Sequence, residues 1–123
     1  MIHLDTNFLI QALVPDSAAA TKLQTWLSDG EALSISAIAF SEFLCGPLTP
    51  EDAALAEVLF AAPEPFLASD APKAAELFNA TGRRSRSLAD CQIAAVALRC
   101  DARMATGNLS DFTLFESHGL TMA

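Results

Sequence analysis

The hydrophobic positions along the chain alternate between short apolar runs and longer stretches with helical spacing. Residues with helical spacing recur, for example, in the stripe formed by Ala19, Leu23, Trp26 and Leu27. Five short runs have the length of buried strands: 2–4, 32–35, 65–68, 102–106 and 120–122. Short strands that alternate with helices predict an α/β fold, a three-layer α/β/α sandwich around a central, mostly parallel sheet of four to five strands.

Residues that favour helix N-termini stand in front of the predicted helices. These residues are Thr6 or Asn7, Ser17, Ser36, Thr49, Asp70 and Ser87. The helices that they predict are 8–13, 18–28, 37–45, 50–62, 71–81 and 88–99, with a short one at 112–116. In the fourth helix, an apolar face is predicted from Leu55, Val58, Leu59 and Ala62.

Length and composition indicate one globular domain spanning residues 1–123. The chain is 52% hydrophobic and 18% charged, which favours a compact core and argues against disorder. No apolar run has the length of a membrane span, and no basic segment precedes the first apolar run, so we expect neither a membrane anchor nor a signal peptide. The three cysteines lack CxxC spacing and are expected to be buried thiols in a reducing cytoplasm.

Four acidic residues lie at or near the points where a strand or turn leads into a helix: Asp5, Glu42, Asp90 and Asp111. Because the carboxyl ends of parallel strands meet at one edge of a sheet, acids placed there can converge. Converging carboxylates repel one another unless a positive partner joins them. Oxygen ligands without accompanying bases indicate a hard divalent ion, Mg²⁺ or Mn²⁺.

Each acid also has a purely structural interpretation. Asp5 could form an Asx-turn, and Glu42 could be a solvated helical residue. Asp90 follows Ser87 at capping-box spacing, and Asp111 could cap the helix 112–116. Against the solvated interpretation of Glu42, its neighbours are strongly apolar, which predicts a charge in need of a partner. These neighbours are Ile38, Phe40, Phe43 and Leu44.

The distribution of charge bears on whether the chain can bind a nucleic acid. The net charge of −8 argues against a broadly basic binding surface. Five of the seven basic residues nevertheless fall within 83–103: Arg83, Arg84, Arg86, Arg99 and Arg103. The first three form a loop that leads directly to Asp90, and guanidinium groups suit phosphate geometry, so we expect them to contact phosphate rather than only solvent.

Four segments carry a resemblance to a known family. Leu4-Asp5-Thr6-Asn7-Phe8-Leu9-Ile10 resembles the first motif of PIN-domain ribonucleases, and Ser41-Glu42-Phe43 resembles the second. The stretch from Ser87 to Ala95 resembles the third motif, and Thr106-Gly107-Asn108-Leu109-Ser110-Asp111-Phe112 resembles the last. Their order, spacing and the total length are similar to those of VapC-type toxins of bacterial toxin–antitoxin pairs, over nearly the whole chain.

The resemblance implies a PIN-like fold, metal-dependent endoribonuclease activity, a cognate antitoxin as partner and a homodimer. Asp5, Glu42 and Asp90 match three acids of the family. The fourth acidic position aligns with either Asn108 or Asp111, so one or two metal ions can be bound. Thr6 and Thr106 are expected to hold a metal-bound water or a phosphate, with ordinary turn hydroxyls as the alternative.

Two other functions were weighed. An aspartate-based phosphotransfer domain fits poorly, because a phosphatase of that kind needs an aspartate where this chain has Asn7. A receiver domain would have only Asp70 available after the third predicted strand. A non-catalytic PIN-fold module for protein interaction predicts eroded acids, whereas Asp5, Glu42 and Asp90 are all present.

Overall fold

Four parallel strands form the sheet of the computed structural model, which describes residues 1–123. The order is β2-β1-β3-β4, and the strands are β1 (Ile2–Leu4), β2 (Leu33–Ser34), β3 (Arg103–Ala105) and β4 (Thr121–Met122). β1 lies between β2 and β3, with Leu4 paired to Ala105. Since all strands run in the same direction, the residues that follow β1, β2 and β3 meet at one edge of the sheet.

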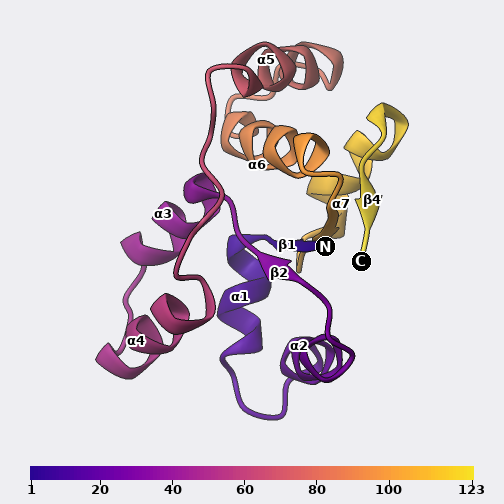
Figure 1. Ribbon diagram of the computed structural model, residues 1–123. Coiled ribbons are helices and arrows are strands. Elements are labelled where there is room, and N and C mark those ends of the chain that lie inside the picture. Colours follow the sequence, from indigo (N-terminus) through magenta and orange to yellow (C-terminus); the bar gives the residue numbers. More distant parts are fainter.

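Helices cover both faces of the sheet and confirm the predicted sandwich (Figure 1). One layer holds α1 (Thr6–Ala12) and α2 (Ala18–Ser28), and the other holds α5 (Asp70–Ala80) and α6 (Leu88–Arg99). Between the layers, α3 (Ala37–Cys45) packs against both α1 and α6. The remaining elements are α4 (Pro50–Leu59), α7 (Leu109–Phe112) and the 3₁₀-helix η1 (Thr113–His118).

The core forms where the sheet meets α6. Ile2 and Leu4 of β1 are fully buried, as is Met104 of β3, and the middle of α6 is buried from Ile93 to Ala97. A helix that is apolar nearly all round must be enclosed, so the sequence predicted this placement of α6 correctly. None of the helices combines the length and apolar character that crossing a bilayer requires.

The predicted strand at 65–68 does not form. The segment touches the sheet only through an isolated bridge, in which Glu64 N–H donates to the Ile35 carbonyl and Ala37 N–H donates to the Glu64 carbonyl. The bridge does not extend past Ser36 because α3 begins at Ala37, and the prolines on both sides of Glu64 disfavour a regular strand there. The sheet therefore has four strands.

The predicted apolar face of the fourth helix is also wrong. The helix ends at Leu59 rather than Ala62, and its buried residue is Ala56. Leu55 is 46% exposed and Val58 is 79% exposed. The helix packs through its small side chain, which allows a close approach of the backbone, and it leaves larger apolar side chains outside.

Three of the predicted caps are confirmed and three are wrong. The N-cap position of α1 is Asp5, so neither Thr6 nor Asn7 caps that helix. Ser17, Ser36 and Thr49 each accept a hydrogen bond from the backbone N–H three residues later. Asp70 is instead the first residue of α5, and its carboxylate binds other groups. The Ser87 hydroxyl donates to the Arg84 carbonyl at 2.9 Å and leaves α6 without a side-chain cap.

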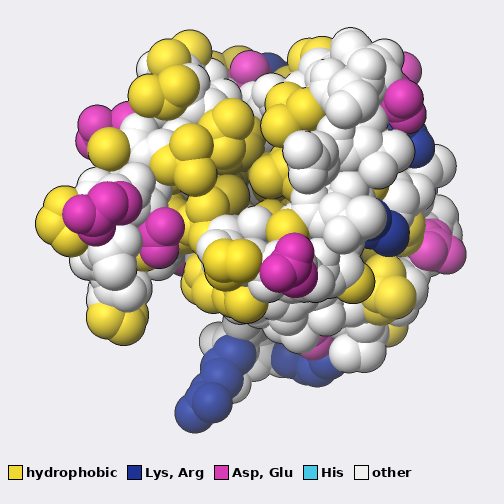
Figure 2. Space-filling model, turned by 90° about the horizontal axis from the view of Figure 1, so that it is seen from below, with side chains coloured by type: hydrophobic (Ala, Val, Ile, Leu, Met, Phe, Trp, Pro, Cys, Tyr) yellow, Lys and Arg dark blue, Asp and Glu magenta, His cyan; other side chains and the backbone are white.

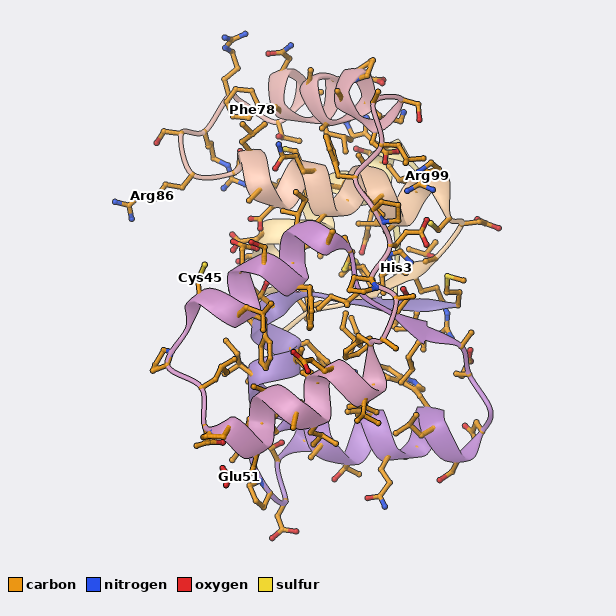
Figure 3. The ribbon with its side chains drawn as sticks, turned by 60° about the vertical axis from the view of Figure 1, so that its left-hand side comes forward. His3, Cys45, Glu51, Phe78, Arg86 and Arg99 are labelled. Carbon is orange, nitrogen blue, oxygen red and sulfur yellow. The ribbon has the colours of Figure 1, made fainter.

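The cysteines differ in burial. Cys91 is buried and Cys100 is half-buried, but Cys45 at the end of α3 is exposed (Figure 3), which corrects the expectation that all three are enclosed.

Candidate active site

The C-terminal edge of the central strands places Asp5 beside Thr106. Asp5 follows β1, and its N–H donates to the Ala105 carbonyl of β3 at 2.8 Å, which continues the pairing of the two strands one residue beyond the end of β1. Thr106 follows β3, and its hydroxyl donates to Oδ2 of Asp5 at 3.0 Å. The Asp5 side chain is buried and makes no capping hydrogen bond to α1, which counts against a capping role for this carboxylate. The neighbouring strand thus fixes its orientation.

A second contact brings Glu42 to this edge. The Thr6 hydroxyl at the start of α1 lies 3.1 Å from the Ala39 carbonyl and 3.2 Å from Oε1 of Glu42, and its one proton serves one acceptor at a time. Glu42 is exposed, contrary to the expectation from its apolar neighbours, because the residues that α3 buries are Ala39 and Phe43. The carboxylate therefore remains hydrated while it borders the site.

Asp90 and Asp111 face the same pocket. The pocket has a volume of about 280 Å³ and is lined by Arg84, Ser85, Arg86, Ser87, Asp90 and Asp111. Asp90 is not half of a capping box, because Ser87 N–H donates to the Arg84 carbonyl instead. Asp111 lies within α7, whose N-cap position is Asn108, so Asp111 is not a cap either.

The four carboxylates are close enough to influence one another's ionisation. Burial raises the pKa of Asp5, and the negative charges of Glu42 and Asp111 raise it further, against the hydrogen bond from Thr106. Burial raises the pKa of Asp90 to about 7, and the charges of Asp5, Asp111 and Glu42 contribute to that rise. Arg84 opposes the rise only in part. The structure thus gathers residues that are up to 106 positions apart in the sequence numbering, from Asp5 to Asp111.

The donor set fits a hard divalent cation in its chemistry. All candidate ligands offer oxygen, and the site is short of positive charge. No three of the acidic side chains lie close enough to hold one ion by direct contact. Mg²⁺ usually keeps several waters and binds through one or two carboxylates, so a pair such as Asp90 and Asp111 matches its needs. Asn108 is exposed outside this pocket, and its N–H donates to the Thr106 hydroxyl at 2.9 Å.

The arginines divide into three groups. Arg84 and Arg86 line the pocket, and Arg86 extends from its loop into solvent (Figure 3). Arg83 turns back onto α5, where it binds Asn79. The other two arginines of the predicted basic cluster are engaged elsewhere: Arg99 binds Asp70 and Glu64, and Arg103 binds Glu31. Arg84 and Arg86 are therefore the two arginines that can contact a substrate in the pocket.

The sequence did not identify two features of the site. Ser85 and Ser87 line the pocket, and the only signal for them was their place between the arginines and Asp90. A side chain at Gly107 would meet the amide of Gln11 at 2.8 Å, so the absence of a side chain there leaves room for the Gln11 side chain to approach the loop that begins with Thr106. A glycine between Thr106 and Asn108 was the visible signal of this close approach.

Comparison with known proteins identifies the family of the chain. The sequence profile of the PIN domain matches residues 2–110, and the chain belongs to the PIN domain family. This confirms the family indicated by the four motifs. No curated protein shows significant similarity to the chain.

Solved structures share the fold at low sequence identity. The structure of VapBC2 from Rickettsia felis bound to a promoter DNA fragment aligns over 100% of this chain and 98% of its own, with a TM-score of 0.76 and 18% identity. FitAcB from Neisseria gonorrhoeae aligns over 99% and 96%, with a TM-score of 0.72 and 24% identity. VapBC-1 from nontypeable Haemophilus influenzae aligns over 100% and 97%, with a TM-score of 0.72 and 20% identity.

Proposed function

We propose that this protein is a metal-dependent endoribonuclease and the toxin of a toxin–antitoxin pair. PIN domains are generally nucleases that use divalent metal ions. The observation that carries the proposal is the convergence of four carboxylates, without an arginine or lysine bound to any of them, beside a pocket lined by two arginines. Metal-dependent phosphodiester cleavage uses this combination, since charge develops on a phosphate that must also be held in place.

The ligands proposed for Mg²⁺ or Mn²⁺ are Asp5, Glu42, Asp90 and Asp111. When bound, the ion supplies a Lewis acid that stabilises negative charge on the phosphate and lowers the pKa of water. The protein supplies orientation: Thr106 fixes Asp5 and Thr6 contacts Glu42, so both hydroxyls position carboxylates. In this proposal the two threonines orient the metal ligands and do not themselves contact the substrate.

Arg84 and Arg86 are proposed to bind the RNA phosphate. Each guanidinium can donate two parallel hydrogen bonds to phosphate oxygens. The pocket also lies at the N-terminal end of α6, where the helix dipole favours an anion. Without a metal ion, the negative charges of the acids repel a nucleic acid. A metal ion bound by the acids offsets this repulsion and so favours binding of a phosphate by the arginines.

The test of the nuclease is cleavage of single-stranded RNA by the full chain. Asp5→Asn and Asp90→Asn should each reduce cleavage by more than about a hundredfold, beyond the loss typical for groups that only support metal ligands. Excess chelator should abolish wild-type cleavage, and Mn²⁺ should restore it. Glu57→Gln, which removes an exposed acid of α4, is the matched control and should cleave normally. Undiminished cleavage by Asp5→Asn in chelator would rule out the mechanism.

An apolar groove supports an antitoxin as partner. It has a volume of about 280 Å³ and is lined by Ile10, Leu13, Val14, Phe43, Gly46, Pro47, Leu48 and Asp52. Figure 2 shows apolar side chains gathered in a hollow on this side of the molecule. Ile10 is 46% exposed and Val14 is 55% exposed, which is unusual for a cluster of large apolar residues. Asp52 at the rim and the net charge of −8 favour an amphipathic helix with basic flanks.

The test of the partner is co-purification with the product of a small neighbouring reading frame. Val14→Glu should reduce recovery of the complex at least tenfold, because it places a charge in the groove. Val58→Glu is the matched control, since Val58 is exposed on α4 and lies outside the groove. Equal recovery for the two variants would exclude the groove as the antitoxin site.

The homodimer and a cytoplasmic location belong to the same proposal. Light scattering on the free chain should give twice the 13.0 kDa of one chain. A non-catalytic interaction module is the competing function that the groove favours. It predicts a stable complex with the partner but no chelator-sensitive cleavage by the purified chain.

A further inference from the structure

Arg83 is held differently from the other arginines of its loop. Gly82 and Arg83 have φ values of 91° and 54°, so two successive residues in the left-handed region turn the chain back over the end of α5. Arg83 N–H donates to the Phe78 carbonyl at 3.0 Å and closes this turn. The side chain of Arg83 is thereby directed along α5, away from the pocket that Arg84 and Arg86 line.

The guanidinium of Arg83 is fixed at two points. Its Nη1 donates to Oδ1 of Asn79 at 2.7 Å, and its central carbon lies 5.9 Å from the centre of the Phe78 ring. Phe78 packs against the hydrophobic core and provides a firm base, whereas Arg83 is exposed. A hydrogen bond to a guanidinium lies in the plane of the group, so it leaves the faces of the group free. The central carbon of Arg83 lies over the Phe78 ring, and the side chain is otherwise exposed to solvent.

We propose that the open face of Arg83, supported by Phe78, is a stacking platform for an unpaired base of the RNA substrate. This inference rests on the proposed function and makes the substrate class more specific: a single strand whose base next to the bound phosphate is unstacked. Arginine planes and aromatic rings stack on nucleobases regardless of sequence, whereas a duplex keeps its bases inside the helix. Figure 3 shows Phe78 at the end of α5, next to the loop that carries Arg86.

The platform and the phosphate pocket would bind different parts of the RNA: the platform a base, and the pocket a phosphate. Arg83 is one residue from Arg84 and three from Arg86, so the platform and the pocket belong to the same loop and would contact neighbouring nucleotides of one strand. The charges of Arg84 and Arg86 would set the salt dependence of binding. The plane of Arg83 would set the dependence on the presence of a base.

The experiment measures binding of single-stranded RNA oligonucleotides that each lack the base at one position. The full chain carries Asp5→Asn, with Mg²⁺ present, so that binding is measured without cleavage. In this parent protein, removal of one particular base should weaken binding about five- to a hundredfold, the range for a single stacked base. In the parent with Arg83→Ala, removal of the same base should cause no further loss.

Three further variants separate the possible roles. Arg83→Lys keeps the charge without the plane and should lose the dependence on that base. Paired Arg84→Ala and Arg86→Ala should keep it, and should lower the slope of log Kd against log salt by about 1.4, as two phosphate contacts on a single strand predict. Lys22→Ala is the matched control, because Lys22 lies 6.0 Å from the ring of Trp26 on α2, far along the chain from the pocket. It should bind like the parent.

The outcomes are distinguishable. If Arg83→Ala changes only the salt slope, or leaves the base dependence intact, Arg83 is a phosphate contact or a cover for Phe78 and the platform is wrong. Chelator-sensitive cleavage by the wild type would leave the proposed function standing in that case. If the parent binds no RNA and the wild type does not cleave it, the proposed function itself fails.

Discussion

The two ends of helix α6 hold buried acids in opposite electrostatic surroundings. At its C-terminal end, Asp70 is 2% exposed and accepts hydrogen bonds from Nε of Arg99 at 2.9 and 3.1 Å, while Arg99 also binds Glu64. At its N-terminal end, Asp5 is 4% exposed and has no arginine or lysine bound to it. Figure 3 shows the two ends of the helix, with Arg99 at one and the loop of Arg86 at the other.

Equal burial therefore has different consequences at the two ends. Asp70 is compensated by Arg99 and by the N–H of Leu67 at 2.9 Å, so this carboxylate ties α5 and α6 to the segment that precedes α5. Asp5 and Asp90 have no bound cation. Burial raises the pKa of both carboxyl groups, and the charges of Glu42 and Asp111 raise both pKa values further. A carboxylate that is paired stabilises the fold, whereas one that is left unpaired costs stability and is retained for what it binds.

The largest expected effect comes from breaking the paired end. Arg99→Ala should lower the free energy of unfolding by about 2–3 kcal/mol, because it leaves the buried Asp70 carboxylate without its cation. Denaturant unfolding measures this loss. Asp5→Asn in chelator is the comparison and should not destabilise the fold, since it removes an uncompensated charge. A greater loss from Asp5→Asn than from Arg99→Ala would reverse the contrast between the two ends.

A smaller effect should separate the two candidates for the fourth ligand. Asp111 shares the pocket with Asp90 and carries a charge, whereas Asn108 is exposed outside it. Asp111→Asn should weaken Mn²⁺ binding about tenfold, and Asn108→Ala should weaken it less. Mn²⁺ titration followed by electron paramagnetic resonance measures both. The opposite order would assign the fourth position to Asn108.

The smallest expected effect is the destabilisation of the metal-free protein by the ionised Asp90 carboxylate. Because the folded pKa is about 7 and the ordinary value is 3.8, the folded state binds more protons between these pH values. The contribution of Asp90 is favourable below pH 3.8 and is lost as the pH rises through 7. In chelator, Asp90→Asn should therefore gain stability over wild type as the pH rises, reaching on the order of 1 kcal/mol above pH 7 after solvent screening.

Thermal unfolding across pH measures this difference. Burial of His3 lowers the pKa of that side chain, so His3 removes stability as the pH falls below 6.5, but it is present in both proteins and cancels in the comparison. Added Mn²⁺ should raise the melting temperature of wild type and reduce the advantage of Asp90→Asn. A variant that melts lower than wild type in chelator at pH 8 would contradict an uncompensated Asp90.

Local patterns in the sequence determined much of the fold. The apolar run 2–4, the caps Ser17, Ser36 and Thr49, and the enclosed α6 all follow from spacing and side-chain chemistry within a few residues. The PIN family also follows from local motifs. The metal ligands themselves remain a prediction, but their gathering at one edge follows from the rule that parallel strands end on the same side.

Only the tertiary structure decided which charges are paired. In the sequence, five arginines form one basic cluster: Arg83, Arg84, Arg86, Arg99 and Arg103. In the fold, Arg99 is drawn to Asp70, 29 positions away, and Arg83 turns onto α5, which leaves two arginines at the pocket. The sequence likewise did not show that Glu42 is exposed, because its apolar neighbours do not enclose it: Phe43 is buried in the core, whereas Leu44 is itself exposed. The partner of a charge depends on contacts between distant segments, and no local pattern encodes those contacts.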